Sequence, residues 1–166
     1  KLNAYKDLVD FFFSHSMNFR VIVIDQNKVN YVAYKEGDEE LGFYTFYFEM
    51  LNKWLLAPNT YKLMLDFKKD REPRRTQVLK RCLEYRVPVG CHIHSLNLID
   101  SFDSPLAQMA DLLTGAVAAS WCGFSAATAK AELADYIARK ANRKSLIQED
   151  PSPAFTKLNV FKIRLR

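Results

Sequence analysis

Apolar residues along the chain alternate between a helical and a strand period. Leu2, Tyr5, Leu8, Val9 and Phe12 recur at three- and four-residue steps, which predicts an amphipathic helix over 2–13. A β-branched run follows at 19–24 and predicts a buried strand closed by Asp25. Further on, the same criteria predict helices over 41–56, 73–86, 105–121 and 128–144, and strands over 61–65 and 90–98. Two segments are less defined: a short strand is expected at 31–34, and a strand or extended tail at 154–165.

Strands that alternate with helices require crossover connections, which favour parallel pairing. We therefore predict an α/β fold with a largely parallel sheet. The length of 166 residues and the hydrophobic share of 49% suit one packed domain over 1–166, with no internal linker.

The net charge of +5 is unevenly distributed. Residues 71–90 hold six Lys or Arg against two acids, and 151–166 hold four and no acid. Between them, 91–126 contain Asp100, Asp103 and Asp111 but no Lys or Arg. Such basic segments attract polyanions, so nucleic acid is the expected partner, although a solvated surface gives the same pattern.

The cysteines and the terminal segment bear on location. Cys82, Cys91 and Cys122 are odd in number and form no CxxC pair, which favours free, buried thiols in a reducing compartment. The apolar run at 8–13 is too short and too charged for a signal peptide, and the stretch 106–121 is too short to span a bilayer. A cytoplasmic protein with no membrane partner is therefore expected.

Three aspartates are the candidate catalytic groups. Asp25 and Asp66 each close a predicted strand, and the carboxyl ends of parallel strands are where α/β domains bind ligands. A turn or helix-cap role is the alternative for each of these two. Asp111 is the only ionisable group of an otherwise apolar helix, so burial of this helix and a functional carboxylate are expected.

Three carboxylates at one sheet edge would suit Mg²⁺ or Mn²⁺, which prefer oxygen ligands and assist phosphodiester hydrolysis. The basic run after Asp66 could hold a phosphate backbone or be a solvated loop. Its candidate nucleic-acid-binding residues are Lys68, Lys69, Arg71, Arg74 and Arg75.

Two other constellations carry less weight. A zinc site could be drawn from His92 and His94 on one face of a strand together with Cys82, Cys91 and His15, but the ligands lack paired spacing. The aromatic residues of 43–54 could stack on bases or meet another chain, yet helical spacing favours a core role for most of them. No Gly-rich phosphate loop, dinucleotide fingerprint or nucleophile elbow is present.

The segment from Ile99 to Val117, IDSFDSPLAQMADLLTGAV, resembles the signature DS-x-x-S-x-x-x-Q-x-A-D-L-x-x-G-A of the domain-of-unknown-function family 3800. Leu63-Met64-Leu65-Asp66 with the basic run after it, Val23-Ile24-Asp25 and the tail at 158–161 also look like parts of that family. The resemblance covers nearly the whole chain, and the part from Gln108 to Gly115 is its most specific.

The resemblance implies a three-layer, ribonuclease H-like fold with a two-metal acidic site. Asp111, Asp66 and Asp25 would bind Mg²⁺ or Mn²⁺ and act as catalytic residues, and Gln108, Ser101 and Asp100 would support them. Family members begin with strands that carry an Asp-Glu-Ser motif, which this sequence lacks, so we expect the N-terminal β-hairpin layer to be missing and the chain alone to be inactive.

Three functions follow as hypotheses: a metal-dependent nuclease, a non-catalytic nucleic-acid-binding module on the same fold, and a protein-interaction or homo-oligomerisation module. Metal binding and salt-dependent binding of nucleic acid would separate them.

Overall fold

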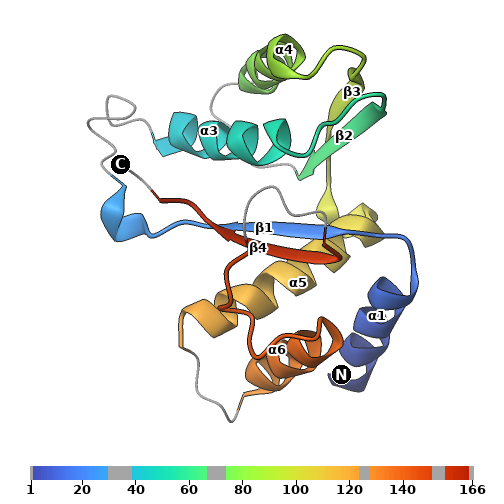
Figure 1. Cartoon of the computed structure of the whole chain (residues 1–166), viewed down its shortest axis with the longest axis vertical. Helices are drawn as coiled ribbons and strands as arrows, with labels where there is room; N and C mark the ends of the chain where they lie inside the picture. Colours follow the sequence, from blue (N-terminus) through green and yellow to red (C-terminus); the bar gives the residue numbers. More distant parts are fainter. Residues whose placement is uncertain (1, 30–38, 67–73, 124–127, 151–155, 165–166) are drawn as a thin grey trace. The chain divides into compact units, whose positions relative to one another are not determined.

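The computed structural model describes residues 2–29, 39–66, 74–123, 128–150 and 156–164 (Figure 1). Within these ranges the chain is mixed α/β, with five α-helices and four strands, as predicted. The strand expected at 31–34 lies outside the described residues. In chain order the elements are α1 (Leu2–Ser14), β1 (Phe19–Val23), the 3₁₀ turn η1 (Gln26–Lys28), α3 (Glu39–Asn52), β2 (Thr60–Asp66), α4 (Arg75–Arg86), β3 (His92–Ile99), the 3₁₀ turn η2 (Ser101–Asp103), α5 (Pro105–Trp121), α6 (Ala129–Lys140) and β4 (Leu158–Lys162).

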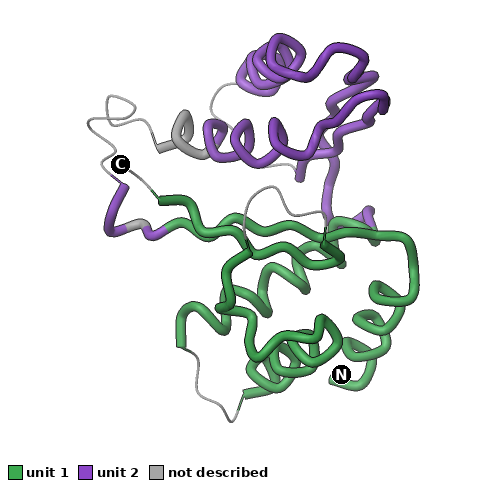
Figure 2. The backbone as a smooth tube through the Cα atoms, viewed as in Figure 1, with its two compact units in different colours: residues 1–24, 105–164, 166 green, residues 25–104, 165 purple. Residues whose placement is uncertain are grey.

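The strands form two separate two-stranded sheets among the described residues, β1 with β4 and β2 with β3, and both pairs are parallel. The chain divides accordingly into two compact units (Figure 2). Unit 1 consists mainly of residues 1–24 and 105–164, and unit 2 mainly of 25–104.

Unit 1 packs α1, α5 and α6 against one face of the β1–β4 sheet (Figure 1). In the parallel register Phe19 lies beside Leu158 and Val21 beside Val160, so alternate apolar side chains point toward these helices. The helices contribute fully enclosed residues such as Phe12, Leu113 and Ile137. One apolar core therefore joins α1 and β1, from the start of the chain, to α5, α6 and β4.

Unit 2 has its own core between the β2–β3 sheet and the helices α3 and α4. Leu65 of β2 and Ile93 of β3 pack with Leu79 and Leu83 of α4 and with Tyr44 of α3. The aromatic helix therefore supplies core residues, as its helical spacing favoured.

Helix α6 ends at Lys140, four residues before the predicted end. Asn142 adopts a positive φ of 54°, and its N–H donates to Arg139 O while Arg143 N–H donates to Ala138 O at 2.9 Å. These two bonds form a Schellman motif, which satisfies the last carbonyls and turns the chain away from the helix axis.

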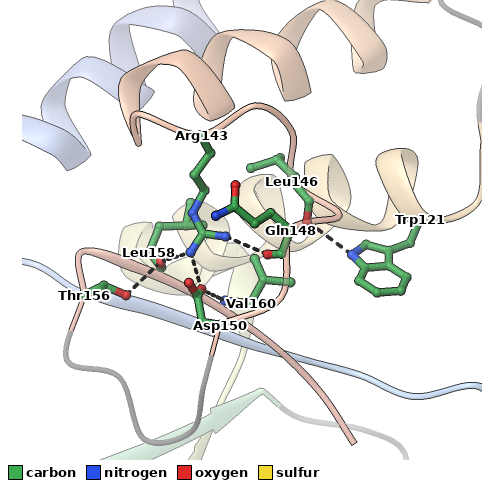
Figure 3. Close-up of polar contacts among 8 residues, drawn as sticks. All are labelled: Trp121, Arg143, Leu146, Gln148, Asp150, Thr156, Leu158 and Val160. Carbon is green, nitrogen blue, oxygen red and sulfur yellow. Dashed lines mark hydrogen bonds and ion pairs between the residues drawn. The ribbon is translucent and has the colours of Figure 1, made fainter.

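A buried ion pair fastens the segment after α6 to β4 (Figure 3). Arg143 pairs with Asp150 and also donates to the carbonyls of Gln148 and Leu158. The Asp150 carboxylate accepts the Val160 N–H at 2.8 Å, and Asp150 N–H donates to Val160 O at 2.8 Å. Asp150 therefore occupies the backbone groups of Val160 on the edge of β4, because β1 pairs along the other edge.

None of the described helices has the length and apolar character needed to cross a membrane.

Candidate functional site at the carboxyl ends of β2 and β3

Three of the predicted site residues meet where β2 and β3 end. Asp66 is the last residue of β2 and lies beside Ile99 in the parallel register, so both strands end at the same edge. Asp66 Oδ1 accepts the Ser101 N–H at 3.1 Å. Asp100 caps η2, and its Oδ1 accepts the Phe102 N–H at 2.9 Å. The sheet register thus places Asp66, Asp100 and Ser101 together.

Solvent access is the second property of this edge. The Asp66 and Asp100 side chains are exposed, and each receives one backbone N–H from the turn that follows β3. Among the described residues, however, no group of three or more Asp, Glu, His or Cys side chains could hold a metal ion. Mg²⁺ commonly binds through one or two carboxylates and keeps several waters. Two exposed carboxylates therefore suit a hydrated ion, but they are fewer than the three carboxylates that the sequence predicted for this site.

Asp25 shapes its own turn. Its Oδ1 accepts the Asn27 N–H at 3.2 Å, and Lys28 N–H donates to Asp25 O at 3.0 Å. The Lys28 ammonium also lies 3.8 Å from Asp25 Oδ2. These local bonds match the turn-forming role that the sequence left as the alternative.

Asp111 is exposed on α5, so the expected burial of this helix on all sides is wrong. The helix buries one face through Leu113, Ala116 and Val117, and this face completes the core of unit 1. Asp111 and the exposed Gln108 lie outside that face. Asp111 belongs to unit 1 and Asp66 to unit 2, and the described contacts place each within its own unit.

The predicted phosphate-binding residues are described only in part. Lys68, Lys69 and Arg71 lie outside the described residues. Arg74 is exposed at the N-cap of α4, and Arg75, the first residue of that helix, is half-buried. The start of α4 is therefore the described part of this basic segment.

The histidines and cysteines form no metal centre among the described residues. His92 and His94 are exposed on β3, whereas Cys91 is buried, and burial raises the pKa of its thiol. All three cysteines are free, as predicted, but Cys82 and Cys122 are exposed, so the expected burial is confirmed only for Cys91.

Sequence reasoning missed a buried polar pair in the β1–β4 sheet. Arg20 and Asn159 are register partners and are only 7% and 0% exposed. Burial lowers the pKa of the Arg20 guanidinium, which lies 5.5 Å from the Phe161 ring. Neither polar atom of the Asn159 side chain has a hydrogen-bond partner among the described residues. The signal in the sequence was a lone amide inside the apolar tail at 158–161.

Comparison with known proteins gave no matching family model, no matching curated protein and no matching solved structure.

Proposed function

We propose that this chain is a ribonuclease H-like α/β domain of the family 3800 type and acts as a divalent-metal-dependent nuclease. The observation that carries the proposal is the meeting of Asp66 with Asp100 and Ser101 at the shared carboxyl edge of two parallel strands. Ligand sites of α/β domains lie at such edges. The free cysteines agree with a reducing, cytoplasmic location.

In this proposal Asp66 binds Mg²⁺ or Mn²⁺ at the carboxyl edge of β2, with Asp100 beside it. Asp111 and Asp25 remain catalytic candidates from the sequence and are tested separately. When bound, the ion would supply an activated water and neutralise charge on a phosphodiester. Ser101 positions the Asp66 carboxylate through its backbone N–H, as the 3.1 Å bond indicates. Asp100 is the second supporting residue at this edge, and Gln108 on α5 remains a supporting candidate from the sequence alone.

The test is a Mn²⁺ titration followed by thermal unfolding. An ion that binds only the folded state stabilises it by about 2.7 kcal/mol at a concentration of 100 Kd. We expect the melting temperature of the wild type to rise with Mn²⁺, and that of Asp66→Asn and Asp100→Asn to rise much less. Asp135→Asn is the matched control, because Asp135 is an exposed acid of α6 outside the proposed site. An equal rise in all four proteins would contradict the assignment.

Activity is tested with the full-length protein. Asp111→Asn should abolish Mg²⁺- or Mn²⁺-dependent cleavage of a labelled oligonucleotide. Cleavage at the wild-type rate would remove Asp111 from the catalytic set.

A non-catalytic nucleic-acid-binding module is the second candidate. It is favoured by one observation, that the described residues contain no group of three metal-ligating side chains. This candidate predicts salt-dependent binding of oligonucleotides with no change of melting temperature on addition of Mn²⁺.

A further inference from the structure

Helix α4 has an outer face that carries charge and an aromatic ring. Leu79 and Leu83 lie on its inner side and are buried in the core of unit 2. On the outer side, successive steps of four, three and four residues put four side chains within a narrow sector of the helix surface. This outer face consists of Arg74, Val78, Arg81 and Tyr85.

The apolar part of the outer face is open to solvent. Val78 is 53% exposed and Tyr85 is 88% exposed. A tyrosine that extends almost completely into water gains little from the fold of its own chain, and such rings are common where a second molecule binds.

The charges of the outer face are uncompensated within the described part of the chain. Arg74 and Arg81 are exposed, and their guanidinium groups have no ion-pair or hydrogen-bond partner there. The single acid of α4, Glu84, is 3.6 Å from Lys80 and is thereby engaged away from this face. The backbone positions of Arg74 and Arg81 are seven residues apart, which corresponds to roughly 10 Å along the helix axis.

We propose that the outer face of α4 binds single-stranded nucleic acid. Arg74 and Arg81 contact backbone phosphates, and the Tyr85 ring stacks on a base between or beside them. Single strands are the fitting occupant because the face of an unpaired base is accessible to an aromatic side chain, whereas a duplex encloses it. This inference rests on the proposed function, since it names the surface that holds the nucleic acid.

The test is fluorescence anisotropy with a labelled single-stranded oligonucleotide and with the duplex of the same sequence, both in EDTA. Tyr85→Ala should weaken single-strand binding by about 5- to 10-fold, while Tyr85→Phe keeps the ring and the affinity. Arg81→Ala should also weaken binding and reduce the slope of log K against log salt by about 0.7.

The charge-matched control is Arg139→Ala, which removes an exposed cation from α6 in unit 1. Its affinity and salt slope should equal those of the wild type. Circular dichroism should show the same helix content in every variant, because Arg81, Tyr85 and Arg139 are all exposed.

Metal chelation separates this inference from the nuclease proposal. The wild type should bind the single strand in EDTA, because the outer face of α4 needs no metal. Wild-type affinity in both Tyr85→Ala and Arg81→Ala would overturn the surface assignment, while a Mn²⁺ response lost in Asp66→Asn would still support the nuclease. The surface assignment would also be overturned if the duplex bound more tightly than the single strand and its affinity did not depend on Tyr85. Binding of polyglutamate with the same affinity and the same dependence on Tyr85 would overturn it as well. Absence of any oligonucleotide binding by the wild type at low salt would contradict both proposals.

Discussion

Replacing Asp150 by Ala should strongly destabilise unit 1. The Arg143 and Asp150 side chains are only 7% and 13% exposed, so the ion pair between them is shielded from water. Asp150 also accepts the Val160 N–H, which couples the pair to β4 (Figure 3). The substitution thus leaves a buried guanidinium without its counter-charge and a strand amide without its acceptor.

The size of the effect follows from these two losses. A hydrogen bond to a charged group contributes about 1.5–3 kcal/mol, and a buried amide left unsatisfied costs about 1–3 kcal/mol. Their sum agrees with the about 3–5 kcal/mol typical of removing one partner of a buried ion pair. Asp150→Asn retains an acceptor for Val160 and should cost less, about 1.5–3 kcal/mol.

Urea unfolding followed by Trp121 fluorescence measures this loss close to the ion pair. The Trp121 indole donates to Leu146 O at 3.2 Å, within the segment that the pair fastens. The chain has two tryptophans, so a Trp54→Phe background leaves Trp121 as the single reporter for unit 1. A loss below about 1 kcal/mol in Asp150→Ala would refute the reasoning. Arg143→Met in the same background should recover part of the loss, because it removes the unpaired charge.

Three further predictions concern stability. The hydrogen bond from Lys140 lowers the pKa of Asp10 below its ordinary value of 3.8. The resulting stabilisation is complete above that value and disappears as the pH falls through the lower pKa of the folded state. Below about pH 4, Asp10→Asn should therefore lose less stability than the wild type. Acid unfolding followed by circular dichroism measures this difference. Asn159→Leu should raise the free energy of unfolding in urea by about 1–2 kcal/mol, because it removes a buried amide without partners, and a loss of stability would show that the amide is satisfied. Ile137→Ala should cost about 2–5 kcal/mol in the same assay, whereas Ile147→Ala at a 52% exposed position should cost little, and equal costs would contradict the assigned core.

The sequence predicted helices and strands well where residues within the element itself determine its type and its ends. Helix α5 begins at Pro105 and ends at Trp121 as predicted, because a proline fits the first helical turn and the apolar run ends at Trp121. The predicted end of α6 was wrong because the apolar period in the sequence continues beyond Lys140. The helix stops where Asn142 adopts a positive φ, which is a backbone property that the apolar period does not show. Periodicity also overestimated the burial of Asp111, since small residues on a helix can either pack or remain exposed.

The candidate site depends on register, which the sequence specifies only in part. The pairing of Asp66 with Ile99 brings Asp100 and Ser101 to the Asp66 carboxylate, and it depends on a register shift between Tyr61 and Lys62 that the sequence pattern does not reveal. Asp25 was expected to close a strand in the same way, but β1 ends at Val23 and the Asp25 side chain is used by the turn at Asn27 and Lys28. Sequence patterns can identify a carboxylate at a strand end, whereas its hydrogen-bond partners are set by the folded backbone.

Direct measurement of Mn²⁺ binding by electron paramagnetic resonance tests the proposed metal site most directly. Free hydrated Mn²⁺ gives a strong signal that decreases when the ion is bound by protein. The wild type and the Asp135→Asn control should decrease this signal in proportion to protein concentration, and Asp66→Asn should not. A signal that the wild type leaves unchanged would contradict the metal-dependent nuclease and leave nucleic-acid binding without catalysis as the function of this domain.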